Sequence, residues 1–248
     1  SASAKESESA AQTRIGYYRQ PTIHNETIVF VAEGDLWKVG AEGGVAQRLT
    51  THPGLETQPS ISPDGRMVAF AGRYEGVNDV FVMPLAGGLP ARLTYFGRRA
   101  EVAGWSPSGK VLCVTLNYST LPNRQLIEVD IATRQHELIP LSQAAQGCYD
   151  DSEQTLYFTR LPFQGSYVKR YKGGTAQNLW KFSADQPEAI ALTADYPGTS
   201  ANPMWYEGRL YFLSDRDGTM NIWSMDSVGG GLKQHTQHVG WDIQSASL

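Results

Sequence analysis

The chain of 248 residues has few cysteines, few charged residues and no long apolar run, and each absence excludes a class of protein. Cys113 and Cys148 are too few for a disulfide framework, and their spacing fits no metal site. No apolar run approaches the roughly 18–20 residues of a membrane helix, so we expect no membrane insertion. Charged residues make up 19%, with a net charge of −4 and no basic block, which argues against a nucleic-acid partner.

Glycine, proline and aromatic residues are abundant. The chain has 25 Gly, 13 Pro, 6 Trp, 12 Tyr and 8 Phe, and 41% of its residues are hydrophobic. This composition excludes a disordered chain and supplies enough apolar surface for a core. Helical periodicity is nearly absent. The pattern therefore predicts an all-β fold of short strands joined by tight turns.

Residues 1–15 are small, polar and mixed in charge. We expect them to lie outside the fold, as a flexible leader, a tag remnant or the region after a removed signal peptide. The last possibility is the basis for predicting a periplasmic location, with a cytoplasmic one as the alternative.

Two short phrases recur along the chain. The intervals between the third residues of the first phrase are 44, 46, 53 and 43. The copies of the first phrase are Arg48-Leu49-Thr50, Arg92-Leu93-Thr94, Leu138-Ile139-Pro140, Ala191-Leu192-Thr193 and Gln234-His235-Thr236. The second phrase occurs as Asp35-Leu36-Trp37, Asp79-Val80-Phe81, Asn178-Leu179-Trp180 and Asn221-Ile222-Trp223. A fixed interval of this size indicates a repeat architecture.

Each repeat has the signals of four strands. The turn Ser62-Pro63-Asp64-Gly65 recurs as Ser106-Pro107-Ser108-Gly109, and each copy leads into an apolar strand. Four strands cannot bury both faces alone, so the units are expected to stack around an axis as blades of a β-propeller. A β-sandwich would also have strands at this density, but it would not need the same phrases at a fixed interval.

We predict five four-stranded antiparallel blades and the first strand of a sixth, which describes a truncated six-bladed propeller. Trp241–Leu248 is expected to form that first strand. The aromatic residues of the second phrase are expected to pack between neighbouring blades. The predicted blades are 17–50, 51–94, 95–141, 142–193 and 194–236, and the sixth begins at 237–248.

The repeat phrases resemble those of TolB, prolyl oligopeptidase relatives and the tricorn protease. Three passages resemble the tricorn protease N-terminal propeller in particular. They are the opening at 20–37, the passage at 92–105 and Tyr171-Lys172-Gly173-Gly174-Thr175 before the next phrase. The resemblance covers nearly everything from Gly16 onward.

The resemblance implies one module of a self-compartmentalising serine peptidase that trims oligopeptides. In that family, propellers gate passage to the active site, and a pair of arginines anchors the C-terminal carboxylate of the substrate. Arg98 and Arg99 match that pair. Two adjacent guanidinium groups also suit carboxylate recognition on chemical grounds, because each is always charged and can bind both oxygens.

The partners implied by the resemblance are oligopeptide substrates, downstream domains of the same chain and further copies in a homo-oligomer. No residue pattern argues for a metal or an organic cofactor. We expect no catalytic residue here, because the five histidines form no credible triad and no Gly-x-Ser-x-Gly turn occurs. The alternative is a non-enzymatic, TolB-like periplasmic propeller that binds other proteins, and a third possibility is the propeller of another hydrolase.

Two further segments superficially resemble ligand loops. The glycines of Tyr171–Thr175 lack the lysine and helix of a phosphate loop, so we expect an irregular insertion at one rim. The segment Asp215–Asn221 lacks the spacing and the closing glutamate of a calcium loop. We expect it to be a hairpin turn, with Asn221 opening the next strand.

Overall fold

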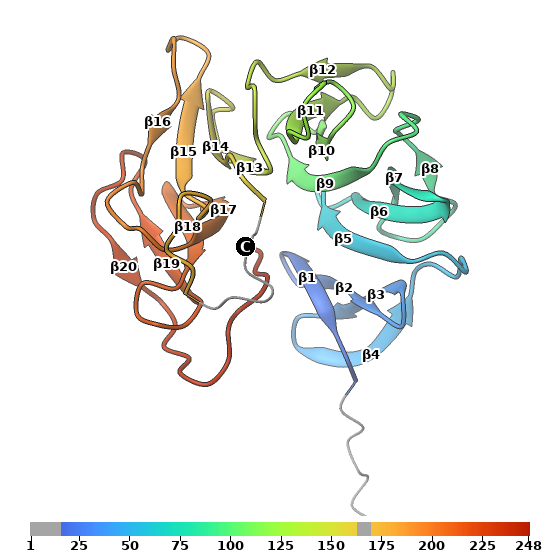
Figure 1. The fold of residues 1–248 in the computed structure, drawn as a ribbon. Coiled ribbons are helices and arrows are strands. Elements are labelled where there is room, and N and C mark those ends of the chain that lie inside the picture. The colour runs from blue at the N-terminus through green and yellow to red at the C-terminus, as the bar shows by residue number, and fades with distance from the viewer. Residues whose placement is uncertain (1–15, 163–169) are drawn as a thin grey trace, which may run out of the picture.

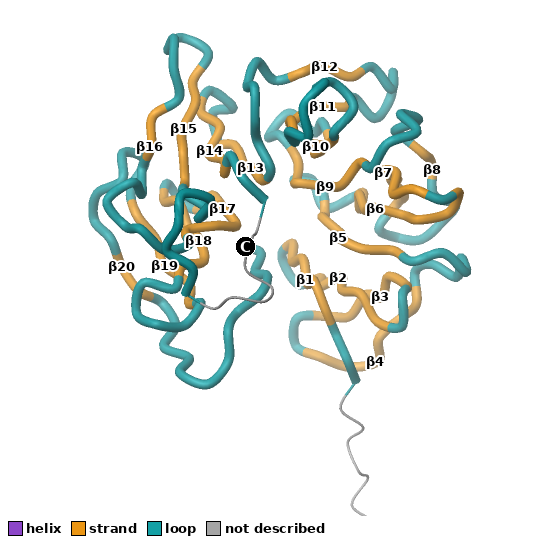
Figure 2. Tube along the Cα trace, in the orientation of Figure 1, coloured by secondary structure: helices purple, strands orange, loops and turns teal. Residues whose placement is uncertain are grey.

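The computed structural model describes residues 16–162 and 170–248, and the predicted leader at 1–15 lies outside them. The described residues contain strands and loops but no helix, so none of them forms a helix that could cross a membrane (Figure 2). The strands form five four-stranded antiparallel sheets, each made of consecutive strands. This confirms the predicted all-β propeller and the predicted make-up of its blades.

The first strand of each sheet lies innermost, and these strands surround a common centre (Figure 1). The first blade contains β1 (Arg19–His24), β2 (Thr27–Ala32), β3 (Asp35–Gly40) and β4 (Gly43–Arg48). The second contains β5 (Glu56–Ile61), β6 (Met67–Glu75), β7 (Val77–Pro84) and β8 (Ala91–Arg92). The third contains β9 (Ala100–Trp105), β10 (Val111–Thr115), β11 (Gln125–Val129) and β12 (His136–Leu138). The fourth contains β13 (Gln146–Tyr149), β14 (Thr155–Thr159), β15 (Leu179–Ser183) and β16 (Ile190–Ala191). The fifth contains β17 (Ser200–Tyr206), β18 (Arg209–Ser214), β19 (Asn221–Met225) and β20 (Lys233–Gln234).

The chain after the fifth blade forms no strand, so the prediction of a strand at Trp241–Leu248 was wrong. This segment passes beside the fifth blade and ends near the centre (Figure 1). Ile243 N donates to the carbonyl of Met220 at 3.0 Å, and the side chain of Asn202 donates to the carbonyl of Ala246 at 3.0 Å. A strand needs a continuous ladder with a neighbouring strand, and these separate bonds do not form one.

The constant spacing between the second phrase and the first phrase within each blade has a direct structural cause. In four blades, the threonine hydroxyl that ends the first phrase accepts a hydrogen bond from the second residue of the second phrase. The pairs are Leu36 N to Thr50, Val80 N to Thr94, Leu179 N to Thr193 and Ile222 N to Thr236, each at 2.9 Å. The third blade has Pro140 at this position and therefore lacks the hydroxyl. In each of these four blades, the threonine hydroxyl links the residues that follow the outer, fourth strand to the start of the third strand.

Apolar clusters fill the spaces between neighbouring blades. Phe70 and Phe81 stack at 5.7 Å between the first two blades, and Trp180 and Trp223 pack against the later clusters. The expected packing between blades is therefore confirmed at three of the four recurring aromatic positions. It was wrong for Trp37, because Leu36 faces the second blade and successive side chains of a strand point to opposite faces.

Candidate functional site: a cationic cluster at the mouth of the blade ring

Arg98 and Arg99 lie in the loop that leads into β9, directly before Ala100. All five innermost strands begin at the same end of the ring, because every blade repeats the same chain direction (Figure 1). The arginine pair therefore lies at that end, beside the centre of the ring. The Thr115 hydroxyl donates to the carbonyl of Arg99 at 3.3 Å and fixes the loop to the end of β10.

A buried carboxylate organises the charges of this site. Glu101 is buried and forms ion pairs with Arg99 and with Arg124, the latter at 3.1 Å. The Arg99 side chain remains 57% exposed and that of Arg124 29% exposed. One carboxylate can occupy only part of two guanidinium groups, each of which has five N–H donors. Both arginines therefore retain donors for a further ligand.

Arg98 adds a third guanidinium group to the same end of the blade, next to Arg99 in the chain. Its Nη1 donates to the carbonyl of Leu116 at 3.4 Å, and within 16–162 and 170–248 it has no carboxylate partner. Two arginines pair with one glutamate, and Arg98 adds a further positive charge beside them, so this end of the blade has an excess of positive charge. Such an arrangement can bind an anion with two oxygens, of which a carboxylate is the simplest example.

Sequence reasoning identified Arg98 and Arg99 but missed Glu101 and Arg124. Glu101 could have been found, because residues two apart on a strand share a face and Arg99 immediately precedes β9. Arg124 gave no such signal. It comes close only because β10 and β11 pair in register beside β9, which returns the chain to the same end of the blade.

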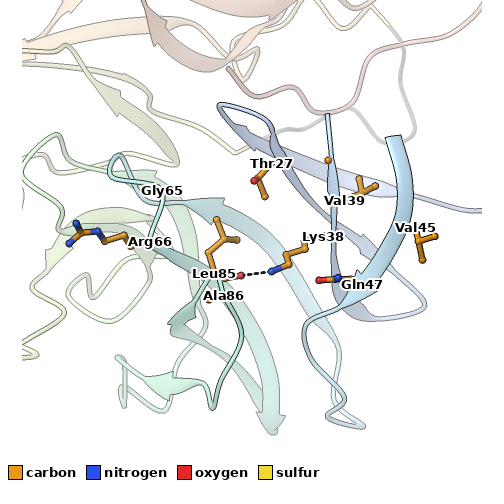
Figure 3. Close-up of a pocket in the computed structure, with 10 residues that line it drawn as sticks. Thr27, Lys38, Val39, Val45, Gln47, Gly65, Arg66, Leu85 and Ala86 are labelled. Carbon is orange, nitrogen blue, oxygen red and sulfur yellow. Dashed lines mark hydrogen bonds between the residues drawn. The ribbon is translucent and has the colours of Figure 1, made fainter. Parts of the chain in front are cut away.

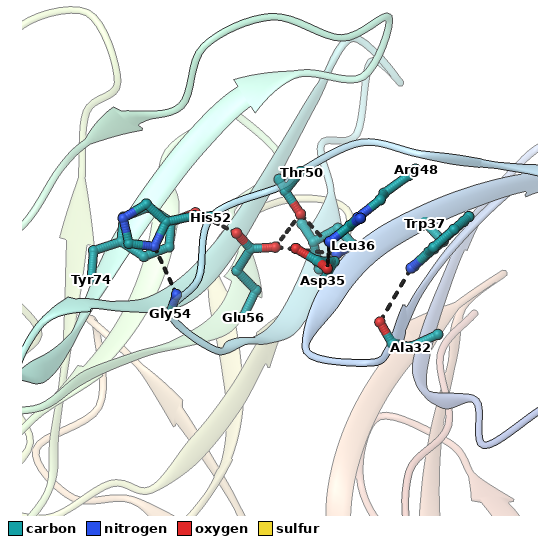
Figure 4. Close-up of polar contacts among 10 residues, drawn as sticks. All are labelled: Ala32, Asp35, Leu36, Trp37, Arg48, Thr50, His52, Gly54, Glu56 and Tyr74. Carbon is teal, nitrogen blue, oxygen red and sulfur yellow. Dashed lines mark hydrogen bonds and ion pairs between the residues drawn. The ribbon is translucent and has the colours of Figure 1, made fainter.

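A second polar network lies at the same end of the ring, between the first and second blades (Figure 4). Glu56 is fully buried and accepts hydrogen bonds from Leu36 N at 3.1 Å, from the Tyr74 hydroxyl at 2.5 Å and from the Thr50 hydroxyl. Burial raises the pKa of Glu56 above its ordinary value, and the negative charge of Asp35 raises it further. Burial likewise raises the pKa of Tyr74.

Asp35 differs from Asp79, its counterpart in the second blade, in its hydrogen bonding to the threonine of the same blade. Thr94 donates its proton to Asp79 Oδ1 at 3.0 Å, whereas Thr50 donates to Glu56. Asp35 Oδ2 pairs with Arg48, but its buried Oδ1 has no hydrogen-bond partner among the described residues. The single hydroxyl proton of Thr50 therefore serves Glu56 at the expense of Asp35.

The two other candidate segments are structural elements. The described part of the insertion, 170–178, is irregular chain between β14 and β15, as predicted, and Arg170 donates to the carbonyl of Gly218 at 2.8 Å. The predicted hairpin at Asp215–Asn221 is confirmed, since Gly218 N donates to the Asp215 carbonyl at 2.9 Å and Asn221 begins β19. Residues 16–162 and 170–248 contain no group of three His, Cys, Asp or Glu side chains placed to bind a metal.

The repeated four-stranded blades define a β-propeller module, and the cationic cluster lies beside their centre. Residues 15–248 match the family described as the tricorn protease N-terminal beta propeller domain, and the chain belongs to that family. It is 32% identical over 236 residues to tricorn protease homolog 1 of Streptomyces coelicolor. It is 30% identical over 241 residues to the tricorn protease homolog of Saccharolobus solfataricus.

The chain spans 22% of the length of each of these two relatives and matches with 93% of its own length. Among solved structures, the tricorn protease superposes with a TM-score of 0.79 at 24% identity, covering 92% of this chain and 23% of that one. TolB from Acinetobacter baumannii superposes with a TM-score of 0.68 at 16% identity, covering 86% of this chain and 53% of that one. Similarities at these identities show the fold alone. The sequence comparison separates the two assignments: the tricorn assignment fits better than the TolB alternative, because the tricorn relatives match along nearly the whole chain.

Proposed function

We propose that this chain is the propeller module of a tricorn-like, self-compartmentalising serine peptidase. In this proposal it gates the passage of oligopeptides and binds their C-terminal carboxylate through Arg98 and Arg99. The observation that carries the proposal is the position of the arginine pair at the mouth of the ring, with guanidinium donors that Glu101 does not occupy.

The chemistry favours a peptide C-terminus over a larger anion. Glu101 already neutralises part of the positive charge and holds Arg99 and Arg124 in place. Arg98 has no internal carboxylate partner within the described ranges and is the residue with the most to gain from a ligand carboxylate. A bidentate pair between guanidinium and carboxylate combines charge with geometric specificity. An extended peptide that enters the ring would place its terminal oxygens at this mouth.

The finer architecture is also a proposal. In the parent protein, a sixth blade would occupy the sector between the first and fifth blades, and further domains of the same chain would supply the catalytic serine. Two uncovered faces support this arrangement. The first blade turns Trp37 toward that sector, and the fifth turns toward it Tyr211, which packs on His235 at 5.0 Å. Homo-oligomeric assembly and a periplasmic location belong to the same proposal, the latter testable by cell fractionation.

The peptide anchor is testable with this chain. Fluorescence anisotropy would compare a labelled oligopeptide that has a free C-terminus with the same peptide amidated at that end. We expect the amide to bind about tenfold more weakly, since it loses a charge-assisted hydrogen-bonded pair. Arg98→Ala should weaken binding of the free acid by a similar factor and leave binding of the amide unchanged.

Arg66→Ala is the matched control, because Arg66 is 84% exposed and lies in the turn between β5 and β6, at the opposite end of the ring. Equal affinity of the two peptides for the unmodified chain would contradict carboxylate anchoring. Binding of a folded protein without any preference for a free C-terminus would favour the TolB-like alternative.

A further inference from the structure

The outer strand of the first blade differs from the outer strands of all the other blades. Its six residues make β4 (Gly43–Arg48) long, whereas β8, β12, β16 and β20 have two or three residues each. Each outer strand pairs on one side only, so its other side presents unpaired N–H and C=O groups. The other four blades thus keep their free edges short, and the first blade does not.

The edge of β4 also lacks the usual chemical protection. Natural edge strands are protected by lysine, proline or inward-pointing charges that prevent pairing with another chain. Between Gly43 and Gln47, β4 contains no charge and no proline, and Val45 is 91% exposed. Its one charged residue, Arg48, forms an ion pair with Asp35 within the same blade. The register irregularity with β3 and the positive φ values of Gly43 and Gly44 confine the regular edge to residues 45–48, which are an available template for a further strand.

A groove of about 620 Å³ adjoins this edge (Figure 3). It lies between the first two blades and is lined by Thr27, Lys38, Val39, Gly40, Val45, Gln47, Gly65, Arg66, Leu85 and Ala86. Lys38 extends across it and donates to the carbonyl of Leu85 at 3.1 Å. The guanidinium group of Arg66 points away from Lys38 (Figure 3).

The groove contains two cations, Lys38 and Arg66, and Lys38 has no counterion among the described residues. None of its lining residues is acidic, and within the described ranges Lys38 forms no ion pair. An ammonium group has three donors, and the Leu85 carbonyl takes one of them. A carboxylate at this point would pair with the remaining donors and would lie near the amide of Gln47, while Val39 and Val45 would contact apolar atoms.

This surface is separate from the arginine cluster. Thr27 and Gly65 adjoin the turns that follow the innermost strands β1 and β5, whereas Arg98 and Arg99 precede the innermost strand β9. The groove and the cluster therefore lie at opposite ends of the blades. A ligand at one does not obstruct the other.

We propose that β4 and the Lys38 groove bind an extended, acidic segment of a partner protein by strand addition. The backbone of the segment pairs with the free edge of β4, and one of its carboxylates binds the Lys38 ammonium. Strand addition obtains affinity from main-chain hydrogen bonds and specificity from alternate side chains that enter a groove. The long edge supports the backbone pairing, and the unpaired lysine supports the acidic side chain.

The test uses the 248-residue chain and a labelled, end-blocked hexapeptide of alternating valine and glutamate, followed by fluorescence anisotropy. We expect saturable binding that weakens about tenfold when glutamine replaces the glutamates. Lys38→Met should cause a similar loss. The matched control, Lys233→Met, removes an exposed lysine of β20 in the fifth blade, outside the groove, and should leave the affinity unchanged.

Val45→Pro and Ala46→Pro test the edge itself. Successive N–H groups of a strand point to opposite sides, so one of the two prolines removes an outward donor and the other a bond to β3. We expect the variant that retains the melting temperature of the unmodified chain to lose the peptide. Absence of binding, equal binding of the glutamine peptide, or binding unaffected by either proline would overturn the proposal. Self-association that the prolines abolish, without peptide binding, would assign the edge to a second copy instead.

Discussion

At the scale of single residues, the environment of Glu56 disfavours its negative charge. It is fully buried and lies close to Asp35, while three hydrogen bonds partly stabilise its ionised form. Burial is the largest influence, and its net effect is a raised pKa. The folded chain therefore retains the Glu56 proton at a higher pH than the unfolded chain does.

This difference predicts a pH dependence of stability. Because the folded state binds the proton more tightly, the contribution of Glu56 is most favourable below its ordinary pKa of 4.5. The contribution declines as the pH rises above that value and becomes constant once the folded-state carboxyl is ionised. We expect Glu56→Gln to remove this decline. Urea unfolding of both proteins between pH 4 and 8 would measure it as a difference that changes with pH.

Glu137→Gln is the matched control, since Glu137 is exposed on β12. Its difference from the unmodified chain should stay constant over the same range. A constant difference for Glu56→Gln as well would contradict the raised pKa.

At the scale of elements, three of the five innermost strands share an irregularity at a polar residue before proline. Gln20, Gln58 and Asn202 have φ values of 49°, 53° and 54°, and each lies within a break in the pairing register. The bulge turns an N–H group toward a neighbouring blade. Gln58 N donates to the Gln20 side chain at 2.9 Å, and Asn202 N donates to Gln146 at 3.0 Å. The bulges therefore connect the blades.

Gln58 allows this element to be tested. A β-branched side chain is strongly disfavoured at positive φ, so we expect Gln58→Val to destabilise the chain by about 1–2 kcal/mol. Gln58→Gly should cost less, because glycine adopts this conformation freely and retains the N–H group. Urea denaturation would compare the two variants. An equal loss for both would show that the side chain of Gln58, rather than its backbone conformation, stabilises the bulge.

At the scale of the whole molecule, the blades are unequally covered. The second, third and fourth blades have a neighbour on both faces, whereas the first and fifth each have one (Figure 1). In a stacked repeat, stability comes largely from the interfaces between neighbouring units. The end blades therefore receive about half of the interfacial stabilisation that the middle blades receive.

We expect native-state hydrogen exchange to show this gradient. Amides of β10, in the third blade, should exchange at least tenfold more slowly than those of β2 and β18, in the end blades, although all three are second strands. Mass spectrometry of peptides from each blade would measure the rates. Uniform protection across all five blades would contradict the argument from unequal interfaces.

Much of the fold was predictable because its signals are local or periodic. The Pro63-Asp64-Gly65 turn sets a hairpin through backbone preferences, and the recurring Thr50 and Thr94 phrases mark one bond that four of the five blades repeat. The absence of a strand at Trp241–Leu248 was not predictable, because pairing depends on a neighbour as well as on the segment. The arginine pair was visible as adjacent residues, but its partner Arg124 was not.

The sequence by itself determined the repeat, the strand order within each blade and the adjacency of Arg98 and Arg99. Periodicity and backbone preference act over a few residues, so no tertiary contact is needed to express them. Only the tertiary structure decided that Glu101 joins two arginines, that Lys38 spans a groove without a counterion, and that Trp37 faces an uncovered sector. These features depend on how separate strands and blades are placed around the ring, which no short segment of the chain encodes.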